Sequence, residues 1–410
     1  MSHYVIIGTG PAGTEAAVTL REKAPFAKIT MISDEGYPFY IREYLIKYID
    51  GLYSENELFQ KGRDYYKEFG FHFVTGRVVA VNTANNKVIL DDGVAIKYDS
   101  LLIASGGKPR SLVVPGGELR GVSTVYSLDD ARRIKKRMKQ AKDVVIVGGG
   151  TLALDLIPGI IVRGARVTVI EKATHILSRF FDPLPSTIIR ETLTKYGTNI
   201  IEATKVVEIQ GLKEQVKQVI LSNNQVIPCD SVLVAIGIQS SIDFLKDSGI
   251  ETDHGIIVNS YLQSNIPNIY AAGDTAQVPD PLHDGKPLLH PSWGSAIEQG
   301  KIAAMNMVGI KTKLKGVIFL KNQQIYDIGF IAAGVLFPLK GDELVVSSSL
   351  EKREFRKFVL RDSRLVGGTI VGVNLPRKPL KQWFTSILLK TEKISFDYKN
   401  LLSWDFYNDL

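Results

Sequence analysis

The feature that most constrains this chain is a pair of glycine-rich turns, each placed between a short apolar run and a helical stretch. The first turn spans Gly8 to Gly13, after the apolar run 4–7 and before a second apolar run at 28–32. The second turn begins at Gly148 and is followed by the apolar run 166–170. Strand, glycine-rich turn, helix and strand together indicate a βαβ unit. Two such units about 140 residues apart are separate modules rather than a solenoid repeat, so the sequence predicts an α/β fold.

The glycines of the first turn occupy positions that a bound dinucleotide requires. Gly8 permits the tight turn, Gly10 lets backbone amides approach a pyrophosphate, and Gly13 lets the helix pack closely on the strand. The N-terminus of the helix adds the positive end of its dipole. Asp34 follows 21 residues after Gly13, where an acid that binds a ribose belongs. A glycine turn without a ligand is the alternative, and the full βαβ context favours a dinucleotide site.

The second turn differs at its third position, where Ala153 replaces glycine in a role that tolerates a methyl group. Glu171 closes the second strand of this unit, and its carboxylate would accept hydrogen bonds from a ribose 2′-hydroxyl and repel a 2′-phosphate. We therefore expect a preference for NADH, although alanine at this position is frequent in NADPH enzymes. Pro158 lies near the middle of the predicted helix, and we expect it to kink or end that helix.

Each half of the chain continues with a ladder of alternating strands and then an apolar strand that closes on glycine. These apolar strands are 101–106 and 232–237. After about residue 308 glycines punctuate β-rich segments, and the last thirty residues are helical and aromatic in character. We expect three domains: residues 1–110 with 243–312 as the first dinucleotide domain, 111–242 as the second, and 313–410 as a C-terminal α+β domain.

The charge of the chain is concentrated in one segment. The net charge is +7, and Ala131 to Lys142 carries seven basic residues and no acid, so the rest of the chain is neutral overall. A nucleic-acid-binding protein would spread its basic residues over a face or interleave them with aromatics, so this pattern disfavours nucleic acid as a partner. We expect the segment to form a solvated helix face, and docking of an acidic partner is the alternative.

Cysteine and histidine usage excludes several kinds of site. Cys229 is the only cysteine, which rules out an internal disulfide, a zinc cluster and a two-cysteine redox centre. We expect it to be a buried structural thiol. The six histidines show no paired metal spacing, so no metal site is predicted. A secretory signal and an apolar run of about 18 residues are both missing, so we expect a cytoplasmic protein without a membrane span.

The segment 265–274 ends in Ile-Tyr-Ala-Ala-Gly-Asp and, together with the two units, resembles the FAD- and NAD-binding pyridine-nucleotide reductases. Within that family the chain looks most like NADH:rubredoxin oxidoreductases, NADH oxidases, the nitrite-reductase flavin module and apoptosis-inducing-factor-like reductases. The resemblance covers essentially the whole chain. It implies a fold of the glutathione-reductase type, with two Rossmann-like domains that hold FAD and NADH and a C-terminal domain beside the flavin.

The resemblance also implies a role for individual residues. Asp274 matches an aspartate that hydrogen-bonds the ribityl chain of the flavin, and Arg42 matches an arginine that contacts the pyrophosphate. Trp293 begins a segment that resembles the family's W-x-x-A-x-x-Q-G helix over the pyrimidine side of the flavin, with core packing as the alternative. The residues assigned to FAD are Gly8, Gly10, Pro11, Ala12, Gly13, Asp34, Glu35, Arg42, Lys47, Val78, Ser105, Gly106, Gly273, Asp274 and Trp293. The residues assigned to NAD are Gly148, Gly150, Thr151, Leu152, Ala153, Glu171, Ile236 and Gly237.

The same resemblance implies two catalytic residues. Lys47 falls where the family places a lysine against the flavin, and Asp155 falls where the family has its glutamate partner. An ammonium beside the flavin favours the anionic reduced form and so promotes hydride transfer into it. Aspartate is one methylene shorter than glutamate, so a direct contact and a contact through water both remain open. A solvated lysine is the alternative for Lys47.

The absence of a cysteine near the first unit separates the subfamilies. Disulfide reductases and peroxidatic NADH oxidases of this superfamily carry a cysteine there, whereas residues 35–60 contain none. The resemblance therefore implies an enzyme that takes hydride from NADH into FAD and passes electrons singly to a small iron or iron–sulfur protein, of rubredoxin or ferredoxin type. A cysteine-less NADH oxidase or a quinone reductase is one alternative, and a redox-sensing interaction module is another. A homodimer is possible within this family.

Overall fold

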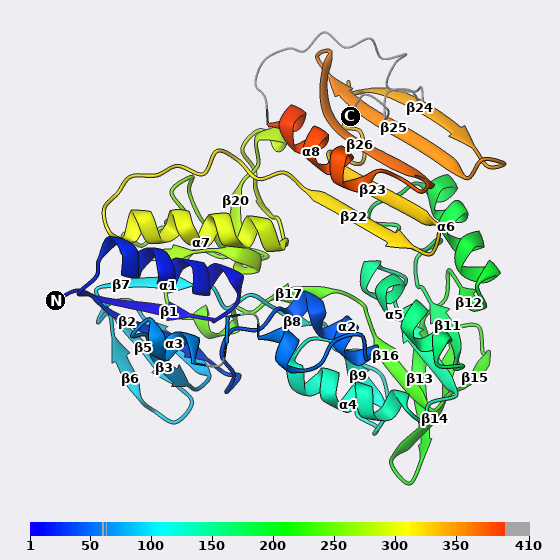
Figure 1. Cartoon of the computed structure of the whole chain (residues 1–410), viewed down its shortest axis with the longest axis horizontal. Coiled ribbons are helices and arrows are strands. Elements are labelled where there is room, and N and C mark those ends of the chain that lie inside the picture. The colour runs from blue at the N-terminus through cyan, green and yellow to red at the C-terminus, as the bar shows by residue number, and fades with distance from the viewer. Residues whose placement is uncertain (60, 63, 390–410) are drawn as a thin grey trace. The chain divides into compact units, whose positions relative to one another are not determined.

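The structure, a computed structural model, describes residues 1–59, 61–62 and 64–389. The chain divides into two compact units (Figure 1). The first consists of Met1–Ile41, Glu55–Lys108 and Ile238–Val317, and the second of Arg42–Ser54, Pro109–Gly237 and the chain from Ile318 onward. The first unit contains most of the predicted first dinucleotide domain, and the second contains most of the predicted second one and the C-terminal region. The division into three domains stays a prediction.

A five-stranded parallel sheet forms the centre of the first unit, in the order β19-β7-β1-β2-β3. Its strands are β1 (His3–Ile7), β2 (Lys28–Ser33), β3 (His72–Thr75), β7 (Ser100–Ile103) and β19 (Ile269–Ala271). Ile7 pairs with Ile32 on one side and with Ile103 on the other, and all three side chains are buried. Such continuous apolar strands are typical of a parallel sheet that is covered on both faces.

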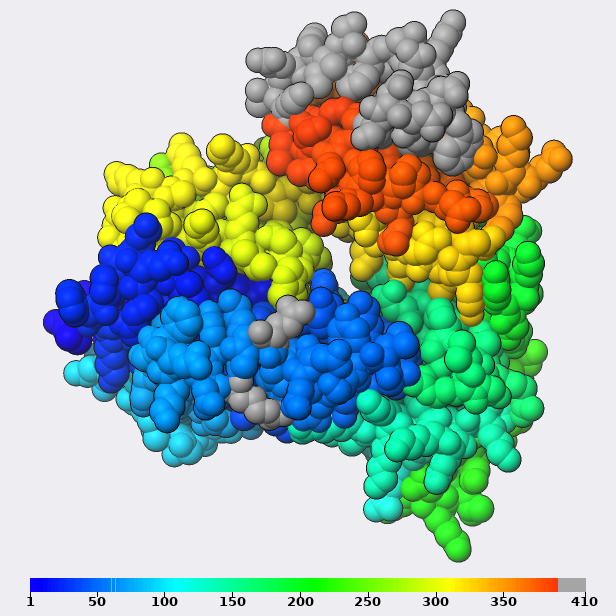
Figure 2. Space-filling view, in the orientation of Figure 1, coloured from blue at the N-terminus to red at the C-terminus, as the bar shows by residue number. Residues whose placement is uncertain are grey.

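Two helices from distant parts of the sequence cover one face of this sheet. They are α1 (Pro11–Lys23) and α7 (Trp293–Met307), which lie against each other in dark blue and yellow (Figures 1 and 2). An antiparallel sheet lies toward the other face and consists of β4 (Val78–Asn82), β5 (Lys87–Leu90) and β6 (Ala95–Lys97) (Figure 1). The remaining elements are α3 (Tyr65–Glu68), β18 (Ile256–Ile257), β20 (Ala276–Pro279) and β21 (Pro287–Leu289). Two strands, β8 (Gly107–Pro109) and β17 (Ile238–Ser240), lie where the chain passes between the units.

The second unit contains a parallel sheet of the same kind, in the order β12-β11-β10-β16-β9. Its strands are β9 (Val122–Thr124), β10 (Asp143–Val147), β11 (Arg166–Ile170), β12 (Thr198–Ile201) and β16 (Ser231–Val234). An antiparallel ladder accompanies it, formed by β13 (Val206–Leu212), β14 (Gln215–Leu221) and β15 (Val226–Pro228). The helices of this part are α2 (Leu45–Ile49), α4 (Leu128–Met138), α5 (Thr151–Val162) and α6 (Pro183–Lys195). The α/β fold class, with two parallel sheets each built around a βαβ unit, is confirmed.

The helix α5 passes through Pro158 without ending. The helix continues to Val162. Of the two expected outcomes, a kink and an end of the helix, an end at the proline is therefore wrong. The neighbouring Gly159 allows a close approach to the helix, because a side chain there would overlap the Asp50 carboxylate. Gly159 therefore marks the place where the end of α2 packs closely on α5.

The C-terminal region is an antiparallel sheet with a helix, in agreement with the predicted α+β composition. The sheet order is β22-β23-β26-β25-β24. Its elements are β22 (Leu320–Ile325), β23 (Ile328–Gly334), β24 (Glu343–Ser349), β25 (Glu354–Arg361), β26 (Arg364–Val373) and α8 (Arg377–Leu388). Phe358 and Phe384 are both fully buried where α8 covers the sheet. The rest of the expected helical and aromatic end, residues 390–410, lies outside the described residues.

The basic segment forms most of α4, and its side chains are not all solvated. Arg137 donates to the Asp230 carbonyl at 2.8 Å, and the Lys135 ammonium lies 3.8 Å from the centre of the Tyr48 ring. The exposed basic residues of this segment include Arg133, Lys136 and Lys139. The expected solvated face is therefore only part of the segment. Within the described residues no helix is both long enough and apolar enough to cross a bilayer.

Candidate dinucleotide sites

The first glycine-rich turn has the backbone geometry that its sequence predicts. Gly8 has a φ of +102°, and a Cβ there would overlap the Ala104 carbonyl. A Cβ at Gly13 would overlap the Gly8 carbonyl, so these two positions are closed to larger residues. Gly10 is different, because apart from its neighbours in the chain no described atom lies within 4 Å of the place where its Cβ would be. The turn therefore leaves open the one glycine that would face a pyrophosphate.

The N-terminus of α1 is available to an anion. Gly10 is the N-cap residue, and among the described residues no side-chain hydrogen bond caps the helix there. Pro11 occupies the first turn, where its missing N–H costs nothing. Unsatisfied backbone N–H groups and the helix dipole together favour a phosphate at this position. The residues present thus fit the pyrophosphate of FAD.

The segment that carries Asp274 is fixed beside this turn by side chains of α7. Gln299 accepts the Gly273 N–H at 2.8 Å and donates to the Ser295 hydroxyl at 2.7 Å. Gly273 has a φ of +78°, and a Cβ there would lie 3.3 Å from the Cβ of Ala12. Asp274 follows directly, and it is half-buried. The structure therefore brings the predicted ribityl-binding aspartate to the start of α1.

The other FAD candidates of the first unit surround the same end of the sheet. Trp293 is half-buried and contacts the Phe39 ring at 5.7 Å, so it is not a fully packed core residue. Asp34 is exposed just after β2, and Glu35 accepts the Tyr40 hydroxyl at 2.6 Å. The other candidates in this unit are Val78, buried on β4, Ser105, whose hydroxyl donates to the Ser241 carbonyl at 2.8 Å, and Gly106, with a φ of +68°. Their roles toward FAD stay predictions.

The second turn repeats the contrast between closed and open glycines. Gly148 has a φ of +103° and lies against the Ala235 carbonyl, whereas Gly150 faces open space. Gly150 caps α5 without a side-chain hydrogen bond, as Gly10 caps α1. Ala153 is fully buried, so its methyl group is accommodated. The other NAD candidates are Thr151, Leu152 and Ile236, which are half-buried, and Gly237, which is exposed.

Glu171 is tied to this turn by both oxygens of its carboxylate. Oε2 accepts the Gly149 N–H at 2.6 Å, and Oε1 accepts the Ala173 N–H at 2.8 Å. An ionised carboxylate offers about four acceptor positions, so each oxygen keeps capacity for a further donor. The carboxylate is thus held in one orientation at the edge of the open turn, where it could accept ribose hydroxyls.

Lys47 and Asp155 both belong to the second unit and have different partners. Lys47 Nζ lies 3.4 Å from the Tyr53 hydroxyl and 5.0 Å from the centre of the Tyr44 ring. Asp155 Oδ1 accepts the Gln323 amide at 2.6 Å. Across the described residues, no ion pair joins Lys47 to Asp155. The predicted catalytic pair therefore stays a prediction.

Gln323 is the residue of this region that sequence reasoning missed. It reaches from β22 to the first turn of α5, where the same amide nitrogen also donates to the Thr151 carbonyl at 2.9 Å. Desolvation by the surrounding protein raises the pKa of Asp155, although part of the side chain is exposed. Lys321 and the Gln323 amide oppose that rise, so both help to keep Asp155 ionised. In the sequence, no motif marks Gln323 or Lys321.

Helix α2, which carries Lys47, is anchored on α5 by a second unpredicted contact. Arg163 Nη1 lies 3.2 Å from Asp50 Oδ1, and its Nη2 donates to the Ile49 carbonyl at 2.7 Å. Burial raises the pKa of Asp50, and Arg163 opposes the rise. Arg42, the predicted pyrophosphate ligand, donates to the Tyr126 carbonyl at 2.6 Å within the same unit.

Cys229 is a buried structural thiol, as predicted. It lies in the core between the ladder and the parallel sheet of the second unit, with 4% of its surface exposed. Burial, with the nearby Asp230 and Asp143 carboxylates, raises the pKa of the thiol to about 12. A thiol with that pKa stays protonated at neutral pH, so it is not a nucleophile.

Two parallel sheets, each with an open glycine-rich turn at a helix N-terminus, define a protein that binds two dinucleotides. Residues 2–300 match the family model described as pyridine nucleotide-disulphide oxidoreductase. The chain therefore belongs to that family, and it is an oxidoreductase that uses FAD and NADH. The predicted family resemblance is confirmed.

Three similar proteins cover most of the chain. Rhodocoxin reductase from Rhodococcus erythropolis is 30% identical over 375 residues, which are 91% of this chain and 86% of that protein. An NADH oxidase from Methanocaldococcus jannaschii is 32% identical over 346 residues, 80% of this chain and 75% of that protein. The crystal structure of a ferredoxin reductase from Rhodopseudomonas palustris is similar with a TM-score of 0.87 and 26% identity, and the match covers 99% of this chain and 98% of that one.

Proposed function

We propose that this protein transfers electrons from NADH through FAD to a small iron or iron–sulfur carrier of the ferredoxin or rubredoxin type. The observation that carries the proposal is the pair of open turns in a chain whose only thiol is buried and protonated. Such a chain can accept hydride but cannot pass it to a disulfide. The similarity to a ferredoxin reductase and to rhodocoxin reductase supports a protein carrier as the acceptor.

Each turn would bind its dinucleotide through main-chain groups. The N–H groups that follow Gly10 and Gly150 would hold the two pyrophosphates. Asp274 would accept hydroxyls of the ribityl chain, and Glu171 would accept those of the NADH ribose. When bound, FAD takes up a hydride from NADH and can release its electrons one at a time.

The charged side chains would set the electrostatics of the reaction. The Lys47 ammonium would stabilise negative charge that develops on the reduced cofactor. Asp155, whose carboxylate accepts the Gln323 amide, would help to hold a positive charge in this region. We place the protein in the cytoplasm as part of the proposal, because NADH is an intracellular reductant.

The test is an anaerobic stopped-flow experiment in two steps. The protein is first reduced with NADH and then mixed in turn with ferredoxin, rubredoxin, a soluble quinone and oxygen. We expect an iron carrier to reoxidise the protein fastest. Faster reoxidation by oxygen or by the quinone than by either carrier would contradict the proposal.

A second candidate is a cysteine-less NADH oxidase, and the 32% identity to an NADH oxidase favours it. The same experiment separates the two, because an oxidase would be reoxidised rapidly by oxygen alone. Failure of every acceptor to reoxidise the protein would instead favour a redox-sensing module.

A further inference from the structure

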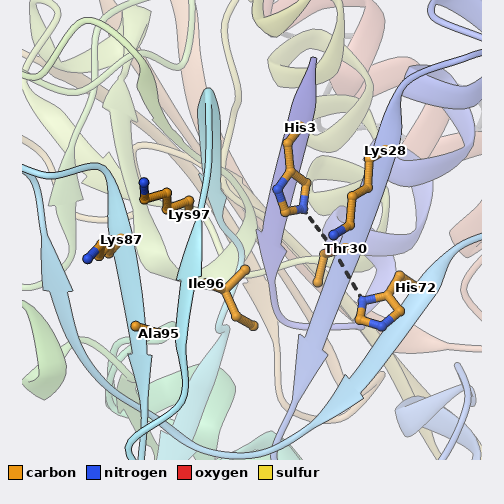
Figure 3. Close-up of a pocket in the computed structure, with 8 residues that line it drawn as sticks. All are labelled: His3, Lys28, Thr30, His72, Lys87, Ala95, Ile96 and Lys97. Atoms are coloured by element: carbon orange, nitrogen blue, oxygen red, sulfur yellow. Dashed lines mark hydrogen bonds between the residues drawn. The ribbon is translucent and has the colours of Figure 1, made fainter. Parts of the chain in front are cut away.

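A pocket lined by cationic side chains lies at the amino end of the parallel sheet in the first unit (Figure 3). Its volume is about 420 Å³, and we call it the basic pocket. It is lined by His3, Lys28, Thr30, His72, Lys87, Ala95, Ile96 and Lys97. The residues His3, Lys28 and His72 begin β1, β2 and β3, whereas the glycine-rich turn follows the other end of β1. The basic pocket is therefore separate from the FAD turn of the same unit.

The lining residues bring positive charge together without a compensating acid. Lys87 and Lys97 are direct cross-strand partners in β5 and β6, and Lys28 is the strand partner of His3. Like charges placed opposite each other destabilise a sheet unless a counter-charge is present. None of the three lysines forms an ion pair with any residue that the structure describes. Asp99, which accepts the His3 backbone N–H at 2.7 Å, lies outside the pocket lining.

A small hydrogen-bonding network lies at the centre of one wall. The Thr30 hydroxyl is 2.8 Å from His3 Nε2 and 3.5 Å from His72 Nδ1. Figure 3 shows both imidazoles and the Lys28 side chain grouped around Thr30, with Lys87 and Lys97 on the facing strands. Thr30 itself is 1% exposed, so the hydroxyl at the centre of the network is held in a buried position. An oxyanion here would meet one ammonium and the edges of the two imidazoles that do not face Thr30.

We propose that the basic pocket binds the phosphate group of a small phosphorylated ligand. Lysine, histidine and threonine are all donors to phosphate oxygens, and charge-assisted hydrogen bonds of this kind are the strong ones. The bound anion would also relieve the repulsion between Lys87 and Lys97. A pocket of about 420 Å³ falls within the size range of small-molecule sites, so it can hold more than a free phosphate ion. The inference does not depend on the proposed electron acceptor.

Binding should strengthen as the pH falls. Partial burial, with the charges of Lys28 and His72, lowers the pKa of His3, while Asp99 raises it. His3 is therefore largely neutral at neutral pH, and an anion beside it would favour the protonated form. The other charged groups that face it, on β2, β3, β5 and β6, are Lys28, His72, Lys87 and Lys97. Proton uptake on binding is expected, and the affinity should be higher at about pH 6 than at about pH 8.

The test is isothermal titration calorimetry on the purified flavoprotein, with inorganic phosphate, pyrophosphate and glycerol phosphate as probes. We compare the wild type with Lys28→Gln and with the double variant Lys87→Gln/Lys97→Gln. Lys301→Gln is the matched control, because Lys301 is an exposed lysine of the same unit on α7. We expect at least about tenfold weaker binding in Lys28→Gln, the loss expected for a charge-assisted hydrogen bond.

The probes and the controls separate the possible outcomes. Tighter binding of glycerol phosphate than of inorganic phosphate indicates an organic ligand, whereas the reverse indicates a free phosphate site. Either result supports the proposal that the basic pocket binds a phosphate group. Equal affinities in Lys28→Gln, Lys301→Gln and the wild type would overturn the proposal. Dissociation constants no tighter than about 1 mM for every probe would also overturn it. NADH-dependent flavin reduction should be unchanged in all variants, which shows that the fold and the FAD turn are intact.

Discussion

The two glycine-rich turns have the same backbone but differ in how an acid is attached to them. In each unit the first glycine of the turn donates its N–H at 2.8 Å to a carbonyl near the end of the next strand, Gly8 to Ile32 and Gly148 to Ile170. In the second unit the residue after Ile170 is Glu171, whose carboxylate accepts a hydrogen bond from the Gly149 N–H of the turn. In the first unit the residue after Ile32 is Ser33, whose hydroxyl accepts the Glu35 N–H at 3.2 Å.

The difference indicates that the two turns recognise their dinucleotides by different means. The first turn relies on shape, because Gly13 leaves no room for a side chain and Asp34 is exposed. The second turn tolerates Ala153 and instead holds a carboxylate rigidly at its edge. FAD is a cofactor that remains bound, so its site needs a close fit. NADH is a substrate that exchanges in every cycle, so its site must distinguish it from other nucleotides. The comparison therefore predicts that changes of shape act on FAD and that changes of charge act on NADH.

The largest effect is expected from Gly13→Ala. The added methyl group would overlap the Gly8 carbonyl and move the turn away from α1. Overpacking of this kind costs about 1–3 kcal/mol, so the FAD affinity should fall by about tenfold or more. The measurement is the FAD content of the purified protein and its dissociation constant by flavin fluorescence.

Ala153→Gly is the matched control for that change. It should retain its FAD and lose only about 1 kcal/mol of helix stability. Full FAD retention by Gly13→Ala would show that the first turn does not rely on close packing.

The next effect is expected from Glu171→Ser. This change removes a charged acceptor for the ribose, so kcat/KM for NADH should fall by about tenfold, as for loss of a hydrogen bond to a charged group. The preference for NADH over NADPH should narrow, because the repulsion of a 2′-phosphate is lost. The measurement is kcat/KM with both nucleotides, beside Asp34→Ser, which should leave the nucleotide preference unchanged. A wild-type enzyme that uses NADPH as well as NADH would contradict the role of Glu171.

A smaller effect is expected from Gln323→Leu, which tests how the second unit supports its turn. The Gln323 amide lowers the pKa of Asp155, so its removal should raise that pKa. Aspartate is charged above its pKa, and therefore the acid limb of the pH profile for flavin reduction by NADH should move to higher pH. Gln324→Leu is the control, because that side chain lies on the same strand and bonds the Tyr326 carbonyl instead. Identical pH profiles for the two variants would show that Asp155 does not affect the reaction.

The smallest effect is expected from Cys229→Ser. No proposed step uses a thiolate, and the thiol pKa of about 12 keeps the group protonated. Turnover with NADH should be unchanged, while thermal unfolding should show a loss of about 1 kcal/mol from burying a hydroxyl in an apolar core. A large fall in turnover at full FAD content would mean that thiol chemistry takes part.

The parts of the site that could be predicted are those that local backbone rules determine. Gly8, Gly10 and Gly13 have fixed roles within one strand, turn and helix, so their spacing was sufficient to predict them. Glu171 was predicted for the same reason, because the end of a strand lies beside the turn. The burial of Cys229 followed from the apolar strands around it.

The parts that could not be predicted depend on contacts between distant segments. Gln323 lies 168 residues from Asp155 in the sequence, and neither residue has a pattern that points to the other. The basic pocket likewise combines residues from five strands, each of which is unremarkable in its own segment. Pro158 shows a different limit, since the helix continues past a residue that ordinarily interrupts it.

The most direct test of the central claim is an anaerobic titration of the purified protein with NADH, followed by flavin absorbance. The account predicts a yellow protein with one FAD per chain, which is bleached stoichiometrically by NADH and only weakly by NADPH. A protein that is colourless and cannot be reconstituted with FAD would contradict the assignment of the first turn. A yellow protein that NADH does not bleach would contradict the assignment of the second.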